Sequence, residues 1–429
     1  MVKMDNLNTN SLPGADTIFR KTFANGSTFL AYPNPTSPAV FFRGLLPVGA
    51  LSNPTGKSGL ANLLAAMLST GTLQHNFQEL NNLIESCGAS ISFSGGSLAT
   101  LFSGQCLKED LPLILGLLLE MLSQPAFPQA HLERLKQQLS VIFKMQAQST
   151  EEMAAQAFDL IYYRGHPYAI PELGLPETVS SISLDDLQDF HRSYFGPRGM
   201  IFTISGGMDS EKTAELFNQI FSSWEKPNQA KQIALPEWQP HQQAMREHIS
   251  IPEKSQSNLI VGTNGPNGLS PDLHTNSLGD NILGRFGMMG RIGEAVRERS
   301  GLAYYASSSL EAGLGPSTWK VYAGVNPNNL DKAIDKIIDE LKRFTNEPVS
   351  REELDDVKSQ TIGQIPLSLE SNAGLASFLL GLQRYNRDLN YLRNLPGTIE
   401  KITAQMILEE AQNYWRLDQL VITSAGSTK

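Results

Sequence analysis

The sequence of 429 residues has few cysteines, no basic excess and no long apolar run. Its two cysteines, Cys87 and Cys106, cannot build a disulfide framework, and we expect two free thiols rather than one bridge between them. The 34 lysines and arginines are outnumbered by 43 acidic residues, which gives a formal net charge of −9. Because general nucleic-acid binding depends on positive charge, we expect no nucleic-acid partner.

The sequence also lacks a segment that could span a membrane. Its most apolar stretch, residues 111–122, is 12 residues long and contains Glu120, whereas a membrane-spanning helix needs roughly 20 residues. Residues 1–19 contain no apolar segment of the kind found in secretion signals. We therefore expect a soluble chain, cytoplasmic if the sequence is full-length, and periplasmic or organellar if a targeting segment is missing.

The motifs of common hydrolases are absent as well. None of the seven histidines has another histidine four residues away or lies in a Cys/His cluster, so the histidine pattern predicts no helical zinc site. The serine nucleophile elbow, Gly-x-Ser-x-Gly, does not occur. Taken alone, the residues argue against an autonomous hydrolase.

What the sequence does contain is a long internal repeat. Residues 175–206 and 395–426 align without a gap at a constant offset of 220, with seven identical residues. Each copy predicts a turn, an amphipathic helix and a strand that closes at a glycine, and each helix has a start signal, Ser183 or Thr403. A repeat of this length is too large for a solenoid and indicates a duplicated domain.

The repeat and the composition together predict the domain organisation. Strand pairs interrupted by helices favour an α+β fold over a doubly wound parallel sheet. Residues 226–243 are rich in Pro, Gln and Lys and predict a linker. We therefore predict two homologous domains, residues 14–225 and 244–427, each with a mostly antiparallel sheet packed against helices.

One pair of residues is a candidate for substrate binding. Arg297 and Tyr304 lie seven residues apart in the segment EAVRERSGLAYYASSS. Residues 292–299 predict a helix end, Gly301 its stop and residues 303–310 a strand. This arrangement can bring a guanidinium and a phenol to one end of a sheet, where they would hold a peptide carbonyl or an oxyanion. On spacing alone, an exposed arginine and a half-buried tyrosine without such a role are the alternative.

Glycines recur every three residues in the segment GRFGMMGRIG, at Gly284, Gly287 and Gly290. The spacing is not that of a dinucleotide-binding loop, and no βαβ unit surrounds it. We predict a flexible loop that leads into a helix and that could contact a peptide.

Four segments carry a family resemblance. The segment MGRIGEAVRERSGLAYYASSS (289–309) resembles the C-terminal-domain signature of the pitrilysin/insulinase-type metallopeptidases, in their small, mitochondrial-processing-peptidase-like branch. Residues 366–385 resemble the family's late helix, residues 166–206 the end of its first domain, and residues 51–72 its zinc-helix region. The matches span nearly the whole chain in the order that the family shows.

The resemblance implies a zinc motif, His-x-x-Glu-His, on the first long helix. In that motif two histidines bind the metal and the glutamate activates its water. Here Asn62, Ala65 and Ala66 occupy those positions, and residues 140–149, where the family's third ligand is expected, contain no carboxylate. We therefore expect that this chain binds no metal or other cofactor by itself.

The family's Arg/Tyr pair is retained at Arg297 and Tyr304. In the family these residues hold substrate at the zinc site, and some members divide the labour between two chains. The resemblance therefore implies a non-zinc-binding subunit, inactive alone, that contributes the pair to a homologous zinc-bearing partner in a heterodimer acting on peptides. The alternative is a catalytically inert structural or peptide-binding scaffold. Peptides are expected to add as a strand to a sheet edge, with residues 99–106 as the predicted edge strand.

Overall fold

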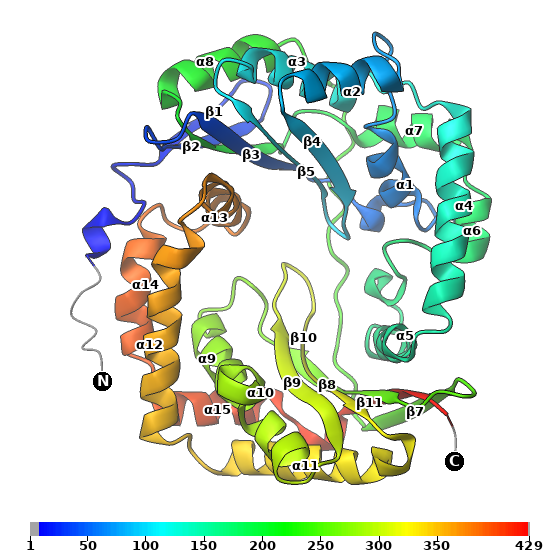
Figure 1. Ribbon diagram of the computed structural model, residues 1–429, viewed down its shortest axis with the longest axis vertical. Helices are drawn as coiled ribbons and strands as arrows, with labels where there is room; N and C mark the ends of the chain where they lie inside the picture. The colour runs from blue at the N-terminus through cyan, green and yellow to red at the C-terminus, as the bar shows by residue number, and fades with distance from the viewer. Residues whose placement is uncertain (1–7, 428–429) are drawn as a thin grey trace.

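Two β-sheets, one from each half of the sequence, form the framework of the protein (Figure 1). The computed structural model describes residues 8–427. The strands of the first sheet are β1 (Phe19–Thr22), β2 (Thr28–Pro33), β3 (Ala39–Leu46), β4 (Ser90–Gly95), β5 (Thr100–Leu107) and β6 (Ile201–Gly206). The strands of the second are β7 (Met245–Ser250), β8 (Ser257–Gly265), β9 (Ala303–Glu311), β10 (Ser317–Val325) and β11 (Val421–Gly426).

Helices cover the sheets and connect their strands. Those of the first half are η1 (Thr9–Ser11), η2 (Ala50–Ser52), α1 (Leu60–Met67), α2 (Phe77–Ser86), α3 (Leu111–Ser123), α4 (Gln129–Gln146), α5 (Thr150–Tyr162), η3 (Pro167–Ala169), α6 (Pro176–Ser180), α7 (Leu184–Tyr194) and α8 (Ser210–Phe221). Those of the second half are α9 (Leu273–Gly284), α10 (Phe286–Gly293), the π-helical η4 (Glu294–Glu298), η5 (Pro327–Asn329), α11 (Leu330–Asn346), α12 (Arg351–Ser368), α13 (Asn372–Arg384), α14 (Tyr391–Glu400), α15 (Ala404–Tyr414) and η6 (Leu417–Gln419).

The two sheets share one topology. The first has the order β1-β2-β6-β3-β5-β4, and the second has the order β7-β11-β8-β10-β9, which is the same order without an equivalent of β1. Each sheet contains one parallel pair, β2 with β6 and β7 with β11, and the remaining pairs are antiparallel. The predicted α+β fold of two homologous, mostly antiparallel domains is therefore confirmed.

The free edges of the sheets correct one prediction. Strand β5 pairs with β3 on one side and with β4 on the other, so residues 99–106 do not form an edge. The edge of the first sheet on this side is β4, and its counterpart in the second sheet is β9. Strands β4 and β5 pair with each other as a hairpin. The sequence pattern of these two strands does not say which of them also pairs with the rest of the sheet.

The repeat in the sequence corresponds to a repeat in the structure. Helices α7 and α15 begin and end at residues that differ by 220, and so do strands β6 and β11. Ser183 and Thr403 cap the two helices, because their side-chain oxygens accept hydrogen bonds from the backbone N–H groups of Asp186 and Met406. The same local chemistry thus starts both copies.

Each half has its own aromatic core. In the first half, Phe29, Phe42 and Phe202 are fully buried, and the ring centroids of Phe29 and Phe202 lie 5.7 Å apart. In the second half, buried Trp319 donates its indole N–H to Asp280 Oδ1 at 2.9 Å. Burying each large apolar side chain contributes about 1.5–3 kcal/mol, so these clusters hold the sheets against their outer helices.

The inner faces of the sheets are covered by an exchange of helices between the halves. Helix α5 of the first half packs on β8 and β11 of the second sheet, where the ring of buried Phe158 occupies the space that Gly262 leaves open. Helix α13 of the second half packs on β3 and β6 of the first sheet, where Arg43 Nη1 donates to Ser377 Oγ at 2.7 Å. Figure 1 shows each helix beside the sheet of the other half.

The exchanged helices are fixed by equivalent hydrogen bonds. Thr203 in β6 donates its hydroxyl proton to the carbonyl of Ala376 in α13, and Thr423 in β11 donates to the carbonyl of Ala154 in α5. Both bonds are 2.8 Å long, and both threonines are fully buried. These threonines occupy matching positions of the repeat, which explains why a buried threonine recurs in both strands.

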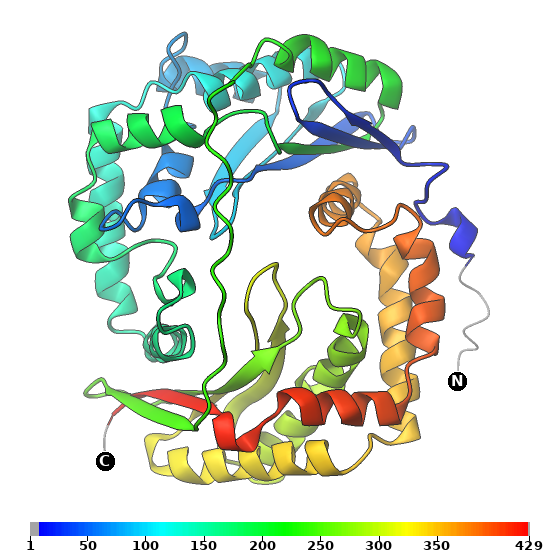
Figure 2. The ribbon, with the colours of Figure 1, turned by 180° about the vertical axis from the view of Figure 1, so that it is seen from behind.

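Residues 222–244 connect α8 to β7 without a helix or strand and run along the back of the molecule (Figure 2). Trp238 in this segment donates its indole N–H to the carbonyl of Tyr162 at 3.1 Å. The domain boundaries proposed from the sequence stay a prediction, because α5 and α13 each pack on the sheet of the other half. Within the described residues no single helix is long and apolar enough to cross a membrane; α12 and α13 reach the required length and composition only together, across a bend of 112°.

Replacing either threonine, as Thr203→Val or Thr423→Val, should lower the free energy of unfolding by about 0.5–1.5 kcal/mol, because a buried hydrogen bond to the exchanged helix is lost. Urea denaturation followed by circular dichroism measures this. Thr22→Val, at an exposed position of β1, is the control and should change stability by less than about 0.5 kcal/mol. Variants of Thr203 and Thr423 that match the Thr22 control would contradict the role given to these bonds.

Candidate functional site

Helix α1 contains Asn62, Ala65 and Ala66, the positions at which the resemblance implies a zinc motif. Its apolar side, with Leu60, Leu64 and Met67, is buried in the first core. Asn62 and Ala66 lie one turn apart and are partly exposed. The helix packs closely on the edge strand β4, since a Cβ added at Gly95 would lie 2.8 Å from the Cα of Asn62. Packing against the first core and against β4 therefore fixes the position and the orientation of this helix.

The residues at these positions do not fit zinc. The methyl groups of Ala65 and Ala66 offer neither a lone pair nor a base, and the single amide of Asn62 is a poor zinc ligand. Residues 140–149, which form the end of α4 and the turn before α5, contain no carboxylate. Across residues 8–427 no group of three or more His, Cys, Asp or Glu side chains is arranged to hold a metal ion.

Arg297 and Tyr304 lie on the helix–turn–strand that the sequence predicts. Arg297 is in the π-helical turn η4, Gly301 ends it with a φ of +60°, and Tyr304 is the second residue of edge strand β9. The turn is closed by a hydrogen bond of 2.9 Å from the Gly301 N–H to the Arg297 carbonyl. Buried Val296 anchors this turn in the second core.

The side chains of this pair face solvent and have little to hold them. Tyr304 is 61% exposed, and within the described part of the chain its hydroxyl makes no hydrogen bond. Within the described residues, the ion pair of Arg297 is with its neighbour Glu298, with 3.6 Å between Nε and Oε1. Such an exposed ion pair contributes little to stability. Neither side chain is therefore needed to hold the fold, and both are available to a ligand.

The structure does not bring this pair to helix α1 of the same chain. The main contacts of α1 are with β4, β5, α4 and α7, all in the first half, whereas Arg297 and Tyr304 lie at the edge of the second sheet. Figure 1 places α1 and β9 in opposite halves of the molecule.

The glycines of the predicted loop lie in helices instead. Gly284 ends α9, and Gly287 and Gly290 are in α10 with φ values of +60° and +64°. A Cβ at Gly284 would lie 2.0 Å from the backbone nitrogen of Ser308, so this glycine lets α9 approach strand β9 closely. A Cβ added at Gly287 would lie in open space. That this glycine contacts a peptide stays a prediction.

A buried ion pair, not predicted from the sequence, positions the helix before η4. Arg291 in α10 is buried and donates from Nε and Nη2 to the two carboxylate oxygens of Glu353 in α12, at 2.6 and 2.7 Å. Burial alone would raise the pKa of Glu353, but the hydrogen bonds from Arg291 and Ser350 outweigh it and lower the pKa to about 2. The Ser-x-x-Glu capping box of α12 is visible in the sequence, but its long-range partner is not.

Fold and site together define a two-domain, peptidase-like chain without a metal-ligand set. A family model described as insulinase (peptidase family M16) matches residues 30–174, and one described as the peptidase M16 inactive domain matches residues 181–361. The chain belongs to the M16 peptidase family.

Individual relatives agree with this assignment. The chain is 24% identical to an uncharacterized zinc protease, YmxG, of Bacillus subtilis over 82% of this chain and 85% of that protein. It is 23% identical to a protein of Helicobacter pylori described as a non-peptidase homolog, over 89% of this chain and 87% of that protein. A crystal structure of a peptidase M16 inactive domain from Pseudomonas fluorescens shares the fold, with a TM-score of 0.89, 23% identity and coverage of 96% and 98%. These relatives agree with membership of the M16 family, and the solved structure shows the same fold.

The purified chain, incubated with zinc and desalted, should retain substoichiometric metal by mass spectrometry, because α1 offers no ligand set. The triple variant Asn62→His, Ala65→Glu, Ala66→His should bind zinc only weakly, since residues 140–149 still supply no third ligand. Tight, stoichiometric zinc binding by the unmodified chain would contradict the conclusion that α1 offers no zinc-ligand set.

The ion pair predicts a change in pH dependence. Because the folded-state pKa of Glu353 lies below its ordinary value of 4.5, the pair stabilises the protein above that value and is lost as the pH falls toward 2. Glu353→Gln should therefore be less stable than the wild type near neutral pH, with a difference that shrinks through this acid range in urea titrations. Glu352→Gln, at an exposed neighbouring position, is the control. A difference that stays constant with pH would refute the assignment.

Proposed function

We propose that this chain is the non-zinc subunit of a heterodimeric zinc metallopeptidase, and that Arg297 and Tyr304 act in the active site of a homologous zinc-bearing chain. Two observations together carry the proposal. Tyr304 is exposed and Arg297 makes only a weak ion pair with its neighbour Glu298, and within the described residues helix α1 contributes to no metal-binding group. Their separation within one chain supports action on a partner rather than on α1 of the same chain.

The chemistry of the pair suits a substrate carbonyl. An arginine presents a planar fork of N–H donors and a tyrosine a single O–H donor, so together they hold a peptide carbonyl or the oxyanion that forms from it. The metal and the general base are expected in the partner chain, where zinc would activate water. This chain's contribution is to bind and orient the substrate.

The free strand edges supply a way to hold an extended peptide. Strands β4 and β9 each lie at one edge of their sheet, with β1 and β7 at the opposite edges, and Tyr304 lies at the start of β9. Backbone hydrogen bonds to such an edge are tolerant of sequence, which suits peptides of varied composition.

An inert scaffold of the same fold is the second candidate. The relative described as a non-peptidase homolog in Helicobacter pylori favours it. In this case Arg297 and Tyr304 would have no partner site, and the chain would bind peptides or other subunits without contributing to cleavage.

The test is a reconstituted complex of this chain with a zinc-bearing M16 chain from the same cells. Arg297→Ala or Tyr304→Phe should lower kcat by about 10²–10³-fold, if these groups act as oxyanion donors. Arg299→Ala and Tyr305→Phe are matched controls, because Arg299 pairs with Glu294 and the Tyr305 hydroxyl accepts a hydrogen bond from Asn258 within this chain.

Native mass spectrometry establishes whether the complex forms with one copy of each chain. A complex whose turnover is unchanged by Arg297→Ala and Tyr304→Phe would overturn the proposed role of the pair. The inert scaffold would then be the remaining candidate function.

A further inference from the structure

A pocket of about 550 Å³ lies between the two halves of the molecule, and both halves line it. The first half supplies the β4–β5 turn and the segment after α5, and the second half supplies the β9–β10 turn and the end of α13. We name it the inter-half pocket. Its volume falls within the range of about 300–1,000 Å³ that is typical of ligand sites. Neither Arg297 nor Tyr304 lines it.

The segments that line the pocket are tied in place by hydrogen bonds. The Tyr162 hydroxyl of α5 donates to the carbonyl of Ser317 at the start of β10, at 2.9 Å. The Gly313 N–H donates to Ser317 Oγ at 3.2 Å, which closes the β9–β10 turn. In the first half, the Ser97 N–H donates to Glu172 Oε1 at 2.6 Å. A ligand therefore meets a preformed cavity and does not have to order these loops.

Three charged side chains line the inter-half pocket, and one of them is neutralised within the chain. Glu311 accepts hydrogen bonds from Lys320 Nζ at 2.9 Å and from the Tyr322 hydroxyl at 2.5 Å. Glu172 and Arg384 are the other two, and within the described residues no ion pair joins them to each other or to another side chain. The pocket thus presents one carboxylate and one guanidinium that lack a counter-ion.

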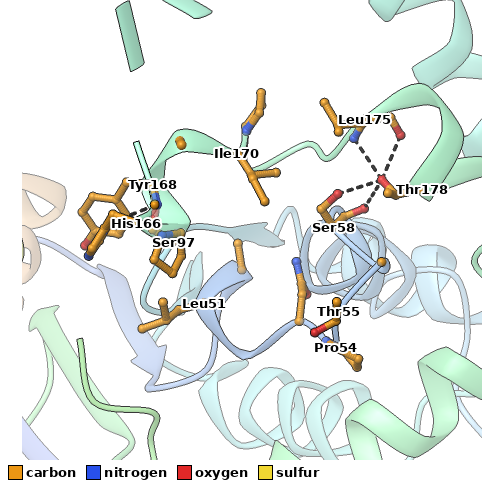
Figure 3. Close-up of a pocket in the computed structure, with 17 residues that line it drawn as sticks. Leu51, Pro54, Thr55, Ser58, Ser97, His166, Tyr168, Ile170, Leu175 and Thr178 are labelled. Carbon is orange, nitrogen blue, oxygen red and sulfur yellow. Dashed lines mark hydrogen bonds between the residues drawn. The ribbon is translucent and has the colours of Figure 1, made fainter. Parts of the chain in front are cut away.

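The charge is specific to this cavity. A neighbouring pocket of about 570 Å³, which lies in the first half between η2 and η3, shares Ser97 and Tyr168 with it (Figure 3). None of the 17 residues that line this neighbour is Asp, Glu, Lys or Arg. The two charges without a counter-ion therefore belong to the cavity between the halves and not to the one beside it.

Tyr168 adds a hydrogen-bond donor to the inter-half pocket. Its hydroxyl reaches from the first half to the β9–β10 turn, since a Cβ added at Gly315 would lie 2.7 Å from the hydroxyl oxygen. Burial raises the pKa of Tyr168 and outweighs the nearby charge of Arg384, which lowers it, while the charge of Glu172 raises it further. The phenol therefore stays protonated at neutral pH, and within the described part of the chain its O–H has no acceptor.

We propose that the inter-half pocket binds a zwitterion, namely a free α-amino acid or a short peptide with both termini free. Its carboxylate accepts hydrogen bonds from the Arg384 guanidinium and the Tyr168 hydroxyl, and its ammonium group donates to Glu172. Hydrogen bonds between charged groups are the strong ones. A simple anion would be repelled by Glu172 and a simple cation by Arg384, so a ligand that carries both charges is the complementary one.

The test is isothermal titration calorimetry of the full chain with the dipeptide Ala-Leu, its N-acetyl form, its C-terminal amide and free leucine. Ala-Leu should bind about tenfold to a hundredfold more tightly than either blocked form, because each block removes one charge-assisted interaction. Leucine that binds as tightly as Ala-Leu would assign the pocket to amino acids, and binding of Ala-Leu alone would assign it to short peptides. Either result supports a zwitterion site.

The variants remove one half of the recognition at a time. Arg384→Gln should bind Ala-Leu and its amide equally, and Glu172→Gln should bind Ala-Leu and its N-acetyl form equally. Each variant thus loses discrimination at one terminus only, which a general loss of structure would not produce. Tyr168→Phe should weaken binding of Ala-Leu by about twofold to tenfold, the effect of one neutral donor. Circular dichroism checks that the variants stay folded.

Arg351→Gln and Glu177→Gln are the matched controls, because both side chains lie at exposed helix positions outside the pocket. Both should keep the affinity and the two preferences. Three results would each overturn the inference: no binding at millimolar Ala-Leu, equal affinity for the free and blocked forms, or preferences that survive in Arg384→Gln and Glu172→Gln. The measurement uses neither zinc nor a partner chain, so its outcome is independent of the role proposed for Arg297.

Discussion

The exchange of helices between the two halves is the constraint on which the rest of the structure depends. Each sheet buries one face against its own aromatic or tryptophan core and the other against a helix that the other half supplies. The hydrogen bonds from Thr203 and Thr423 fix these helices at equivalent places. Because neither sheet is covered on both faces by its own half, the halves hold one another in a set orientation, and the ends of the β4–β5 and β9–β10 hairpins line one shared pocket.

Helix α1 shows how fold and chemistry separate within a family. Its packing uses an apolar side, which includes the buried methyl group of Ala65, and the close contact of Gly95 with the backbone of Asn62. None of these contacts needs a metal-binding side chain, so the helix is held in place without one. The Arg/Tyr pair is the reverse case, because it contributes little to folding and is nevertheless present.

Local patterns in the sequence predict the elements but not their neighbours. The repeat predicts α7, α15, β6 and β11, because caps and strand ends are set by a few adjacent residues. The edge strand was misassigned, although alternating serines in β4, at Ser90, Ser92 and Ser94, are in retrospect the polar pattern of an exposed edge. The ion pair of Arg291 with Glu353 and the exchanged helices both join segments far apart in the chain, and no local spacing encodes them. The helix–turn–strand pattern singles out Arg297 and Tyr304 as candidates, but spacing alone equally fits an exposed Arg and Tyr without a role, and the family resemblance is what favours substrate binding.

The exchange has a consequence for the order in which the protein can fold during synthesis. All strands of the first sheet have been synthesised once Gly206 is added, but the helix that covers one of its faces, residues 372–384, is synthesised only after strands β7 to β10 of the second sheet. Until then Leu30 and Leu45, which lie against that helix in the finished protein, face solvent on a nascent chain. Contacts between residues so far apart in the sequence form slowly. We therefore expect the newly made first half to bind chaperones. A chain that ends before residue 372 leaves one face of the first sheet uncovered.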